Sequence, residues 1–450
     1  MKSEDMMKTV VVLGAGLVTG PLVRYLLDRP DLKVEVADVE PDKAACLVAG
    51  HPRGSSRELN IRDEALLDRL VEGADLIISM VPYVYHPLVA RRCIARGKNM
   101  VTASYVGPSM KDLDAEARSR GVLILNELGL DPGIDHMEAL RVIRGVKSAG
   151  GRVRGFVSYC GGLPAPEANT NPFGYKFSWS PLGVLLASKN AARYLCDGRI
   201  VEVPAEQLFD HPARIEIPGL GLFEGYPNRD AMPYIDTYGI PETETMLRGT
   251  LRYPGWCAVM RAFNRLGFLD QKEKSWPGGN LRSFFLESAG LKGAADPRRA
   301  LQEALGPDRE VLERIEWLGL MDDKPLSAGS RSVLDVLAEC MIERLRYEDQ
   351  ERDMTLLQHE FLVECPKGKF ERITSTLLDY GIPGGDSAMS RTVGLPVGVA
   401  AALICDGSLK MAGVRIPTEP EIYEPVLREL QRFGITFREK REETSGVSKG

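Results

Sequence analysis

Hydrophobic residues between positions 9 and 126 form short runs that alternate with helical patterns. The runs that predict buried strands lie at residues 10–13, 34–37, 76–81, 99–102 and 122–125. Helical patterns such as 22–28 and 87–96 separate them. Because this alternation is what a parallel sheet with right-handed crossovers requires, it predicts a doubly wound α/β domain over residues 1–130.

The pattern changes after residue 151. Residues 153–160 predict a strand, and the Gly-, Pro- and Asn-rich passage up to residue 225 holds only short strands such as 214–217, which suits an antiparallel sheet with long functional loops. Residues 257–349 are almost wholly helical, with 331–346 as the clearest amphipathic helix, before strands return at 354–363 and 370–378. We therefore expect a mixed α+β sheet domain at 131–255 and 350–385, interrupted by a small all-α insertion at 256–349.

The last part of the chain predicts a return to the first domain. The segment Asp386-Ser387-Ala388 caps a long helix of small residues that runs to about residue 405, in which Gly394 and Gly398 permit close packing. We expect residues 386–438 to complete the first domain. Residues 439–450 are charged and small, and they predict a disordered tail.

Composition and charge exclude several classes of protein. A net charge of −6 and the lack of a basic run argue against a nucleic-acid surface. No apolar run is long enough to predict a membrane span, and the amino terminus lacks the apolar core of a signal peptide. The eight cysteines form no CxxC pair. We therefore expect a cytoplasmic protein that has no metal site and binds neither nucleic acid nor membranes.

The first strand leads into a glycine-rich turn that is typical of dinucleotide binding. The first glycine, Gly14, permits a tight turn, and Gly16 lets backbone N–H groups approach a pyrophosphate at the start of the next helix. Thr19 stands where the third glycine is usual, and a glycine-rich turn of an unrelated α/β domain is the alternative. The expected contacts from this turn are Gly14, Gly16, Leu17, Val18 and Thr19.

Asp38 ends the second strand about twenty residues further on, as this type of fold expects. Its carboxylate can accept hydrogen bonds from the ribose hydroxyls, and it would repel the 2′-phosphate of NADP. The sequence therefore favours NAD over NADP in a variant Rossmann domain. NADP stays possible, because Arg53 and Arg57 could reach the phosphate from a neighbouring loop.

Several other residues follow strands at the edge where open α/β sheets bind ligands. Ser104 and Tyr105 follow the fourth strand, which would place a phenol near the reacting ring, and a packing aromatic is the alternative for Tyr105. The further residues expected to contact the cofactor are Asn60, Ser79, Val81, Pro82, Ser104 and Leu130.

Two blocks are denser in special residues than connectors need. In residues 126–136, Asp131 precedes a proline, is held extended and favours a site, whereas Asp135 is expected to cap a helix and His136 to pack. In residues 159–167, Cys160 ends a strand beside two glycines and is therefore more accessible than a core cysteine, although most single cysteines are inert.

These blocks together resemble the saccharopine dehydrogenase family of the glutamate-forming type. The resemblance runs through the whole chain and rests on residues 14–20, 104–105, 126–136, 159–167, 176–179, 226–230 and 247–253. It implies a reaction of lysine metabolism in which saccharopine is oxidised to an imine, water adds, and glutamate separates from 2-aminoadipate 6-semialdehyde. NADP-using members place an arginine after the second strand, where this chain has Asp38.

The resemblance also implies roles for individual residues. Asp131 and Cys160 would be the acid/base groups of the catalytic site and Tyr105 would lie in that site with them, and the substrate would be a tricarboxylate amino acid bound by a homodimer. The implied substrate contacts are Ser104, Tyr105, Ser178, Arg229, Arg248, Gly249 and Thr250. Two alternatives stay open: a dehydrogenase for another carboxylated imine, of the carboxynorspermidine or opine type, and a non-catalytic dinucleotide-binding regulator.

Overall fold

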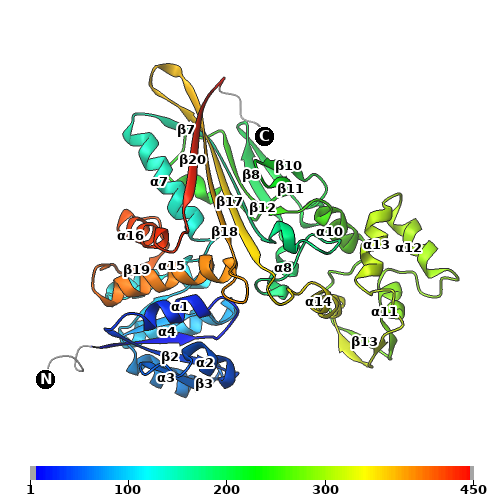
Figure 1. The fold of residues 1–450 in the computed structure, drawn as a ribbon, viewed down its shortest axis with the longest axis horizontal. Coiled ribbons are helices and arrows are strands. Elements are labelled where there is room, and N and C mark those ends of the chain that lie inside the picture. The colour runs from blue at the N-terminus through cyan, green and yellow to red at the C-terminus, as the bar shows by residue number, and fades with distance from the viewer. Residues whose placement is uncertain (1–6, 446–450) are drawn as a thin grey trace. The chain divides into compact units, whose positions relative to one another are not determined.

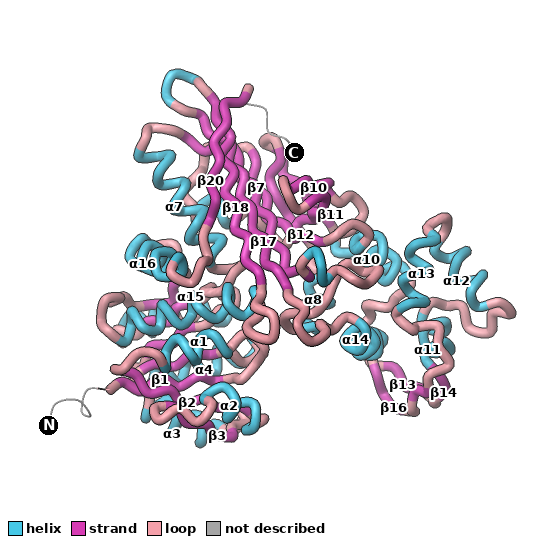
Figure 2. Tube along the Cα trace, in the orientation of Figure 1, coloured by secondary structure: helices cyan, strands magenta, loops and turns pink. Residues whose placement is uncertain are grey.

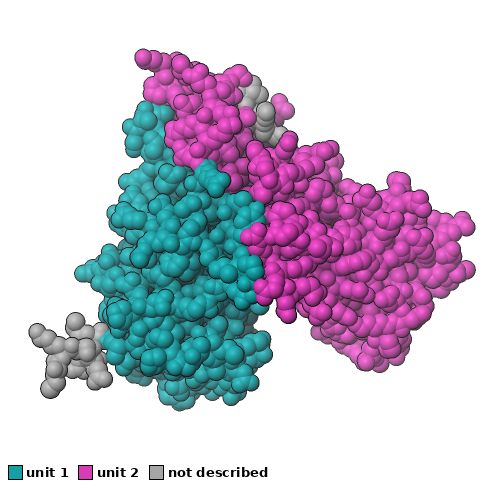
Figure 3. Space-filling model, in the orientation of Figure 1, with its two compact units in different colours: residues 1–151, 377–438 teal, residues 152–376, 439–450 magenta. Residues whose placement is uncertain are grey.

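The computed structural model describes residues 7–445, which divide into two compact units (Figures 1 and 3). Unit 1 comprises Met1–Gly151 and Leu377–Arg438, and unit 2 comprises Arg152–Thr376 and Glu439–Gly450. The boundary after residue 151 lies later than the expected domain end at 130. The intervening residues belong to unit 1 because their helix packs against the C-terminal helix of the same unit.

Unit 1 contains a seven-stranded sheet whose strand pairs are parallel and whose order is β19-β6-β5-β4-β1-β2-β3. This confirms the doubly wound fold, with ligand-binding geometry expected where β1 and β4 lie side by side. The strands are β1 (Lys8–Leu13), β2 (Leu32–Asp38), β3 (Gly54–Glu58), β4 (Leu76–Ser79), β5 (Asn99–Val101), β6 (Leu123–Leu125) and β19 (Gly413–Arg415).

Helices cover the sheet of unit 1, so its strands are apolar on both faces. Val11 and Leu13 of β1 belong to a core that also contains Leu67 and Val89 from two covering helices. The helices are α1 (Gly20–Leu27), α2 (Pro41–Val48), α3 (Glu64–Gly73), α4 (His86–Arg96), α5 (Pro108–Lys111), α6 (Asp114–Ser119), α7 (Ile134–Ser148), α15 (Ala388–Cys405) and α16 (Pro420–Gln431). A short 3-10 turn, Tyr83–Tyr85, precedes α4.

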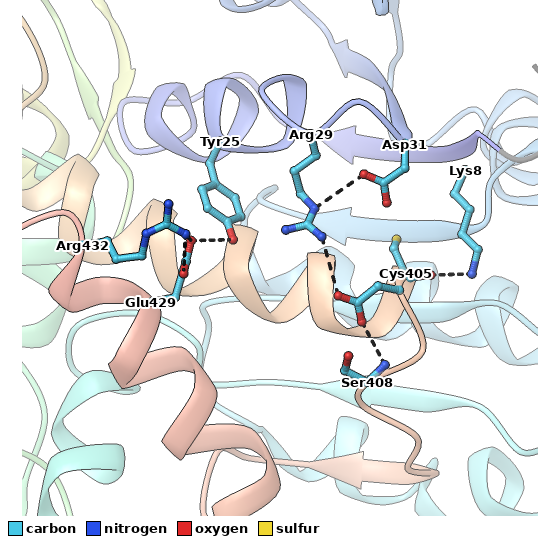
Figure 4. A network of polar contacts seen from close by, with 9 residues as sticks. Lys8, Tyr25, Arg29, Asp31, Cys405, Ser408, Glu429 and Arg432 are labelled. Carbon is cyan, nitrogen blue, oxygen red and sulfur yellow. Dashed lines mark hydrogen bonds and ion pairs between the residues drawn. The ribbon is translucent and has the colours of Figure 1, made fainter. Parts of the chain in front are cut away.

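The C-terminal segment returns to unit 1, as the sequence predicts. Ser387 caps α15 by accepting from Ser390 N at 3.0 Å. A Cβ at Gly394 would lie 2.6 Å from the Val18 carbonyl oxygen, so only glycine lets α15 approach the turn before α1 this closely. Polar contacts support this packing (Figure 4): Lys8 with the Cys405 carbonyl and Arg29 with Asp406 at the C-terminal end of α15, and Tyr25 of α1 with Glu429 of α16.

Helix α15 is apolar and long enough to span a membrane by length and composition, and 83% of its 18-residue window is buried inside the protein. It packs against α1 and α16. Its apolar surface is therefore used in the core of unit 1.

Unit 2 is built on a nine-stranded sheet with the order β10-β11-β12-β7-β17-β18-β20, in which β8 also pairs with β12 and β9 (Figures 1 and 2). The sheet is mixed rather than antiparallel throughout, because β12 runs parallel to β7. The strands are β7 (Arg152–Pro164), β8 (Ala192–Cys196), β9 (Arg199–Val203), β10 (Ala213–Ile217), β11 (Gly221–Pro227), β12 (Thr245–Arg252), β17 (Asp353–Glu364), β18 (Phe370–Tyr380) and β20 (Phe437–Thr444).

The region from 256 to 349 is mainly helical, but it is not all-α and shares one core with the sheet of unit 2. Phe173 and Tyr226 lie in the same buried cluster as Phe263, Leu301 and Met341. Its helices are α10 (Trp256–Arg265), α11 (Leu281–Ser288), α12 (Pro297–Leu305), α13 (Arg309–Trp317) and α14 (Val333–Arg344), and its four short strands are β13 (Lys274–Trp276), β14 (Gly279–Asn280), β15 (Pro325–Leu326) and β16 (Gly329–Arg331). Earlier in unit 2 lie α8 (Pro181–Ala187) and α9 (Pro233–Thr237), and 3-10 turns lie at Pro166–Ala168, Ala205–Gln207 and Pro366–Gly368.

The prediction of a disordered tail is wrong for residues 439–444, because these residues belong to the edge strand β20. Charged side chains attach this strand to its surroundings: Glu443 pairs with Lys369, and Arg441 with Glu371. A charged, exposed edge strand has no hydrophobic run to reveal it, which is why composition suggested disorder. Residues 446–450 lie outside the described part of the chain.

Candidate functional site

The turn between β1 and α1 has the geometry that a dinucleotide site needs. Gly14 has φ +106°, and a Cβ there would lie 2.8 Å from the Met80 carbonyl oxygen, so both conformation and space require glycine. Thr19 is fully buried and its hydroxyl donates to the Gly14 carbonyl at 3.3 Å. Thr19 therefore ties the start of α1 to the turn, a structural use for the residue in place of the third glycine.

Gly16 leaves room for a ligand at this turn. A Cβ at Gly16 would meet nothing within 4 Å, so the absence of a side chain is not explained by packing within the protein. Leu17 beside it is 69% exposed, which is unusual for a large apolar side chain. The open approach to backbone N–H groups before α1 fits a bound pyrophosphate.

Asp38 at the end of β2 is bonded to the turn itself. One carboxylate oxygen accepts from Ala15 N at 2.6 Å and the other from Glu40 N at 2.8 Å. The carboxylate thus holds the turn against the second strand, in addition to any contact with a ribose. Asn60 lies near this edge, just after Leu59 N donates to the Asp38 carbonyl at 2.8 Å, and its side chain accepts from Arg62 N at 3.0 Å.

The ends of β4 and β5 are joined by a histidine that the sequence analysis did not single out. His86 Nδ1 lies 2.8 Å from Ser79 Oγ, and its Nε2 lies 2.8 Å from Ser104 Oγ and 3.3 Å from Thr102 Oγ1. His86 is 2% exposed, and burial lowers its pKa to about 4. The ring is therefore neutral near pH 7 and can donate to one hydroxyl and accept from another. Val81 and Pro82 follow Ser79 at the same edge but lie outside this network.

Tyr105 and Asp131 meet at the same sheet edge. The Tyr105 hydroxyl donates to Asp131 Oδ1 at 3.0 Å, so the alternative of a purely packing aromatic does not hold. Asp131 is partly exposed, whereas Leu130 before it is 2% exposed and packs inside. Unit 1 therefore places a phenol and a carboxylate together on the side where the strands end.

The loop that carries Asp131 closes on itself. Gly129 N donates to the Pro132 carbonyl at 2.8 Å and Ile134 N to the Gly129 carbonyl at 2.9 Å. Asp135 is not the helix cap that we expected: Gly133 occupies that position, and Asp135 in the first turn accepts from Gly133 N at 2.6 Å. His136 is buried, as predicted, and its Nε2 lies 2.9 Å from Glu127 Oε2.

Cys160 lies in β7 of unit 2, and its neighbours follow from strand register. It pairs with Thr250 of β12 on one side and with Leu357 of β17 on the other. Cys160 is partly exposed, as expected for an accessible thiol, whereas Cys93, Cys257, Cys340 and Cys405 are buried. Because paired residues point to the same face of a sheet, Cys160 and Thr250 lie side by side on one face.

Two buried arginines flank Thr250 on that face. Side chains alternate along β12, so Arg248 and Arg252 point the same way as Thr250; they are 4% and 5% exposed. Arg248 stacks over the Tyr234 ring at 4.2 Å, and Arg252 over the Tyr175 ring at 4.9 Å. Gly249 faces the opposite side, where the Tyr159 ring leaves no room for a Cβ, so packing explains this glycine.

Arg252 was not among the predicted site residues. Its Nε has no hydrogen-bond partner in the described part of the chain, while one Nη donates to the Leu251 carbonyl at 2.8 Å. Burial alone would lower the pKa of the guanidinium, but neighbouring tyrosines and cysteines, Cys160 among them, raise it. Burying a guanidinium among aromatic rings and thiols rather than carboxylates costs free energy unless a ligand supplies the negative charge.

The remaining predicted substrate residues lie in loops of unit 2. Ser178 is 7% exposed, and its hydroxyl has no hydrogen-bond partner among residues 7–445. Arg229 is exposed, has φ +56°, and lies two residues after the end of β11. Lys176, which belongs to the same block as Ser178, is buried and instead forms an ion pair with the partly exposed Glu351 at 2.5 Å.

Sequence signals existed for some of the residues that were missed. His86 begins α4 only a few residues beyond the block containing Ser79, and Glu127 and Arg252 lie inside blocks already singled out. Their importance depends on partners far away in sequence. Within the described residues there is no group of three or more His, Cys, Asp or Glu side chains that could hold a metal ion.

Comparison with known proteins agrees with this geometry. A family model described as the saccharopine dehydrogenase NADP binding domain matches residues 10–125, and one described as the saccharopine dehydrogenase C-terminal domain matches residues 129–435. The chain is 38% identical to the saccharopine dehydrogenase (NADP(+), L-glutamate-forming) of Schizosaccharomyces pombe and 40% identical to that of Saccharomyces cerevisiae, each over 96% of this chain and 99% of the relative.

Two further matches extend the comparison. The chain is 38% identical to the mitochondrial alpha-aminoadipic semialdehyde synthase of Mus musculus, over 96% of this chain and 47% of that protein. The solved structure of apo saccharopine dehydrogenase (L-Glu forming) from Saccharomyces cerevisiae has a TM-score of 0.87 and 38% identity, and the match covers 97% of this chain and 100% of that one.

These matches correct the expected cofactor preference. A nicotinamide dinucleotide is supported, but the family domain and the fungal relatives are named for NADP, so the preference for NAD drawn from Asp38 is contradicted. The physical reason lies in the contacts of Asp38. Its carboxylate is engaged by Ala15 N and Glu40 N, so a structural role in the turn accounts for an acid after the second strand, and the acid is not by itself a reason to exclude NADP.

Proposed function

The chain belongs to the saccharopine dehydrogenase family, and from this premise we propose that it catalyses the L-glutamate-forming oxidation of saccharopine. In this reaction a secondary amine is oxidised to an imine, water adds to the imine carbon, and L-glutamate separates from 2-aminoadipate 6-semialdehyde. The observation that carries the proposal is the hydrogen bond between Tyr105 and Asp131, because it places proton-transfer groups at the ligand-binding edge of the sheet.

We propose that Asp131 and Cys160 move the protons of this reaction. The Tyr105 phenol donates to Asp131 and so orients its carboxylate, which we propose accepts a proton from the substrate ammonium. The partly exposed Cys160 thiol can exchange a proton when water adds and the carbinolamine collapses. A bound nicotinamide dinucleotide supplies the hydride acceptor.

The substrate-binding groups that we propose are cationic. Saccharopine carries three carboxylates, and the face of unit 2 that holds Cys160 also holds the buried Arg248 and Arg252. Arginine binds carboxylates through two parallel N–H groups. Arg229 and the Ser178 hydroxyl lie in loops of the same unit and are proposed as further contacts.

We propose NADP as the cofactor, in line with the names of the family domain and the fungal relatives. Asp38 is then expected to weaken NADP binding rather than to exclude it. Asp38→Asn keeps an acceptor for Ala15 N and removes the charge, so KM for NADP should fall by about 2- to 5-fold relative to KM for NAD, as expected for one screened charge. Asp112→Asn on the surface is the control, and an unchanged ratio of the two KM values would show that Asp38 does not face the phosphate.

The test of the reaction is a steady-state assay of the full chain with saccharopine and NADP, and then with NAD. We expect reduced dinucleotide, glutamate and the semialdehyde to form in equal amounts. Turnover of a carboxynorspermidine- or opine-type imine in place of saccharopine would identify the alternative enzyme. Binding of the dinucleotide without turnover of any of these substrates would favour the non-catalytic regulator.

The homodimer is a proposal that rests on the family resemblance, and the cytoplasmic location is a proposal that rests on the spread of the eight cysteines without a CxxC pair. Light scattering on the purified chain across concentrations tests the first, and a mass equal to one chain at all concentrations would reject it. Fractionation of the source cells tests the second.

A further inference from the structure

Tyr105 lies between two residues that are each connected to a buried histidine. Ser104, before it, is bonded through its hydroxyl to His86 Nε2 at 2.8 Å. Val106, after it, donates its backbone N–H to Glu127 Oε1 at 2.9 Å, and the other oxygen of Glu127 lies 2.9 Å from His136 Nε2. Neither histidine has a role in the proposed proton transfers.

Both connections run from the sheet edge into the interior of unit 1. His86 is 2% exposed, Glu127 3% and His136 0%. A shift of Tyr105 would therefore leave buried polar groups without their partners, which is costly in a low-dielectric interior.

Glu127 also connects the two halves of the arrangement. It adopts φ +58°, a left-handed conformation that is uncommon for residues other than glycine, and its N–H donates to the Ser104 carbonyl at 3.1 Å. From this position Glu127 contacts the residues on both sides of Tyr105, and it begins the closed loop that carries Asp131. A strained residue that persists at a ligand edge is held there by its surroundings.

We propose that His86 and His136 are positioning residues that together hold the Tyr105 phenol against Asp131. This inference rests on the proposed function for its kinetic consequences. His86 acts through Ser104 and His136 acts through Glu127, so neither has to touch the substrate. A displacement of about 1 Å at a reacting group can reduce the rate by up to about 100-fold, which gives such residues a measurable effect.

Substituting each histidine with asparagine and, separately, with glutamine tests its two ring nitrogens one at a time. An asparagine amide reaches roughly where Nδ1 lies and a glutamine amide roughly where Nε2 lies. His86→Asn therefore loses Ser104, whereas His86→Gln keeps it, and the same pair at His136 loses or keeps Glu127. We expect kcat to fall about tenfold in each asparagine variant and less than about threefold in each glutamine variant, with KM for saccharopine nearly unchanged.

A double-mutant cycle with Tyr105→Phe distinguishes positioning from general loss of stability. If His86 acts through the phenol, His86→Asn should reduce kcat about tenfold in the native background and less than about twofold in the Tyr105→Phe background. Thr392→Val is the control for stability, because Thr392 is buried in α15 of the same unit and its hydroxyl donates to the Ala388 and Met389 carbonyls of its own helix. Equal losses of kcat in both backgrounds would overturn the proposal.

Hydrogen exchange gives a readout that does not depend on turnover. The Val106 amide should exchange faster in His136→Asn than in His136→Gln, because only the first loosens Glu127. If the native chain turns over no substrate, the proposed function fails while this exchange experiment still tests the positioning. Equal exchange at Val106 in the native chain and both His136 variants would overturn the role of His136.

Discussion

In unit 1, the polar groups at the ligand edge of the sheet are bonded to neighbours within the unit: Ser79 and Ser104 to the neutral His86, and Asp38 to the backbone of the glycine turn. In unit 2, the corresponding face of the sheet buries Arg248 and Arg252 over aromatic rings. The polar groups of the first arrangement have hydrogen-bond partners within their own unit, whereas the Nε of Arg252 in the second has no hydrogen-bond partner among the described residues. We infer that unit 1 provides a preformed sheet edge at which a ligand is oriented, and that unit 2 binds a negatively charged substrate.

The largest loss of kcat is expected when the proposed proton-transfer groups of both units are substituted. Asp131→Asn together with Cys160→Ser should lower kcat by about 100- to 10,000-fold, the range that general acid–base groups contribute. Cys196→Ser, which alters another partly exposed cysteine of unit 2, is the control and should leave kcat unchanged. A double variant with nearly native kcat would remove both residues from the mechanism.

Substitution of the buried cation of unit 2 comes next. Arg252→Met should weaken saccharopine binding by about 2–5 kcal/mol, as for one partner of a buried charge pair, while KM for the dinucleotide stays the same. Arg214→Met on the exposed face of β10 is the matched control. If both variants keep the native KM for saccharopine, Arg252 is balanced by its aromatic neighbours and the contrast between the units fails.

The neutral histidine of unit 1 predicts a pH dependence of stability. The pKa of His86 is about 4 in the folded chain, below its ordinary 6.5, because burial disfavours the charged form. The folded state thus binds fewer protons than the unfolded state between these two pH values. The contribution of His86 to the free energy of unfolding is therefore complete above pH 6.5 and is lost as the pH falls toward 4. The expected loss is about 2–4 kcal/mol, measured as the urea midpoint against pH. His86→Gln should flatten this part of the curve, and an equally steep curve in that variant would assign the effect to other groups.

The smallest effects are expected from alanine substitutions at Gly14 and Gly16, which should change different properties of the protein. Gly14→Ala should destabilise unit 1 by about 1–3 kcal/mol, because alanine disfavours φ +106° and its Cβ would approach the Met80 carbonyl. Gly16→Ala should leave the melting temperature within about one degree but weaken dinucleotide binding about tenfold, since its Cβ enters the space where a ligand is expected. Thermal unfolding and fluorescence titration measure the two effects. Equal losses of stability in both variants would show that Gly16 also serves packing.

Much of the fold follows from local patterns in the sequence. The strands of unit 1 that are buried on both faces are hydrophobic throughout, so their order along the chain predicts the doubly wound sheet. The exposed β3, the three-residue β19 and the charged β20 carry no such pattern, and all three were missed. Their pairing depends on neighbours distant in sequence.

By itself, the sequence determined the Rossmann-type unit, its glycine turn, the capped return helix and the blocks around Asp131 and Cys160, because each is encoded within a few neighbouring residues. Only the tertiary structure decided which polar side chains act together. His86 joins the ends of two strands, Asp38 serves the turn, and Thr250 and Arg252 share a face with Cys160 because β12 pairs with β7 in one particular register. Such convergence depends on strand order and register, which are long-range properties that local hydrophobic periodicity does not specify.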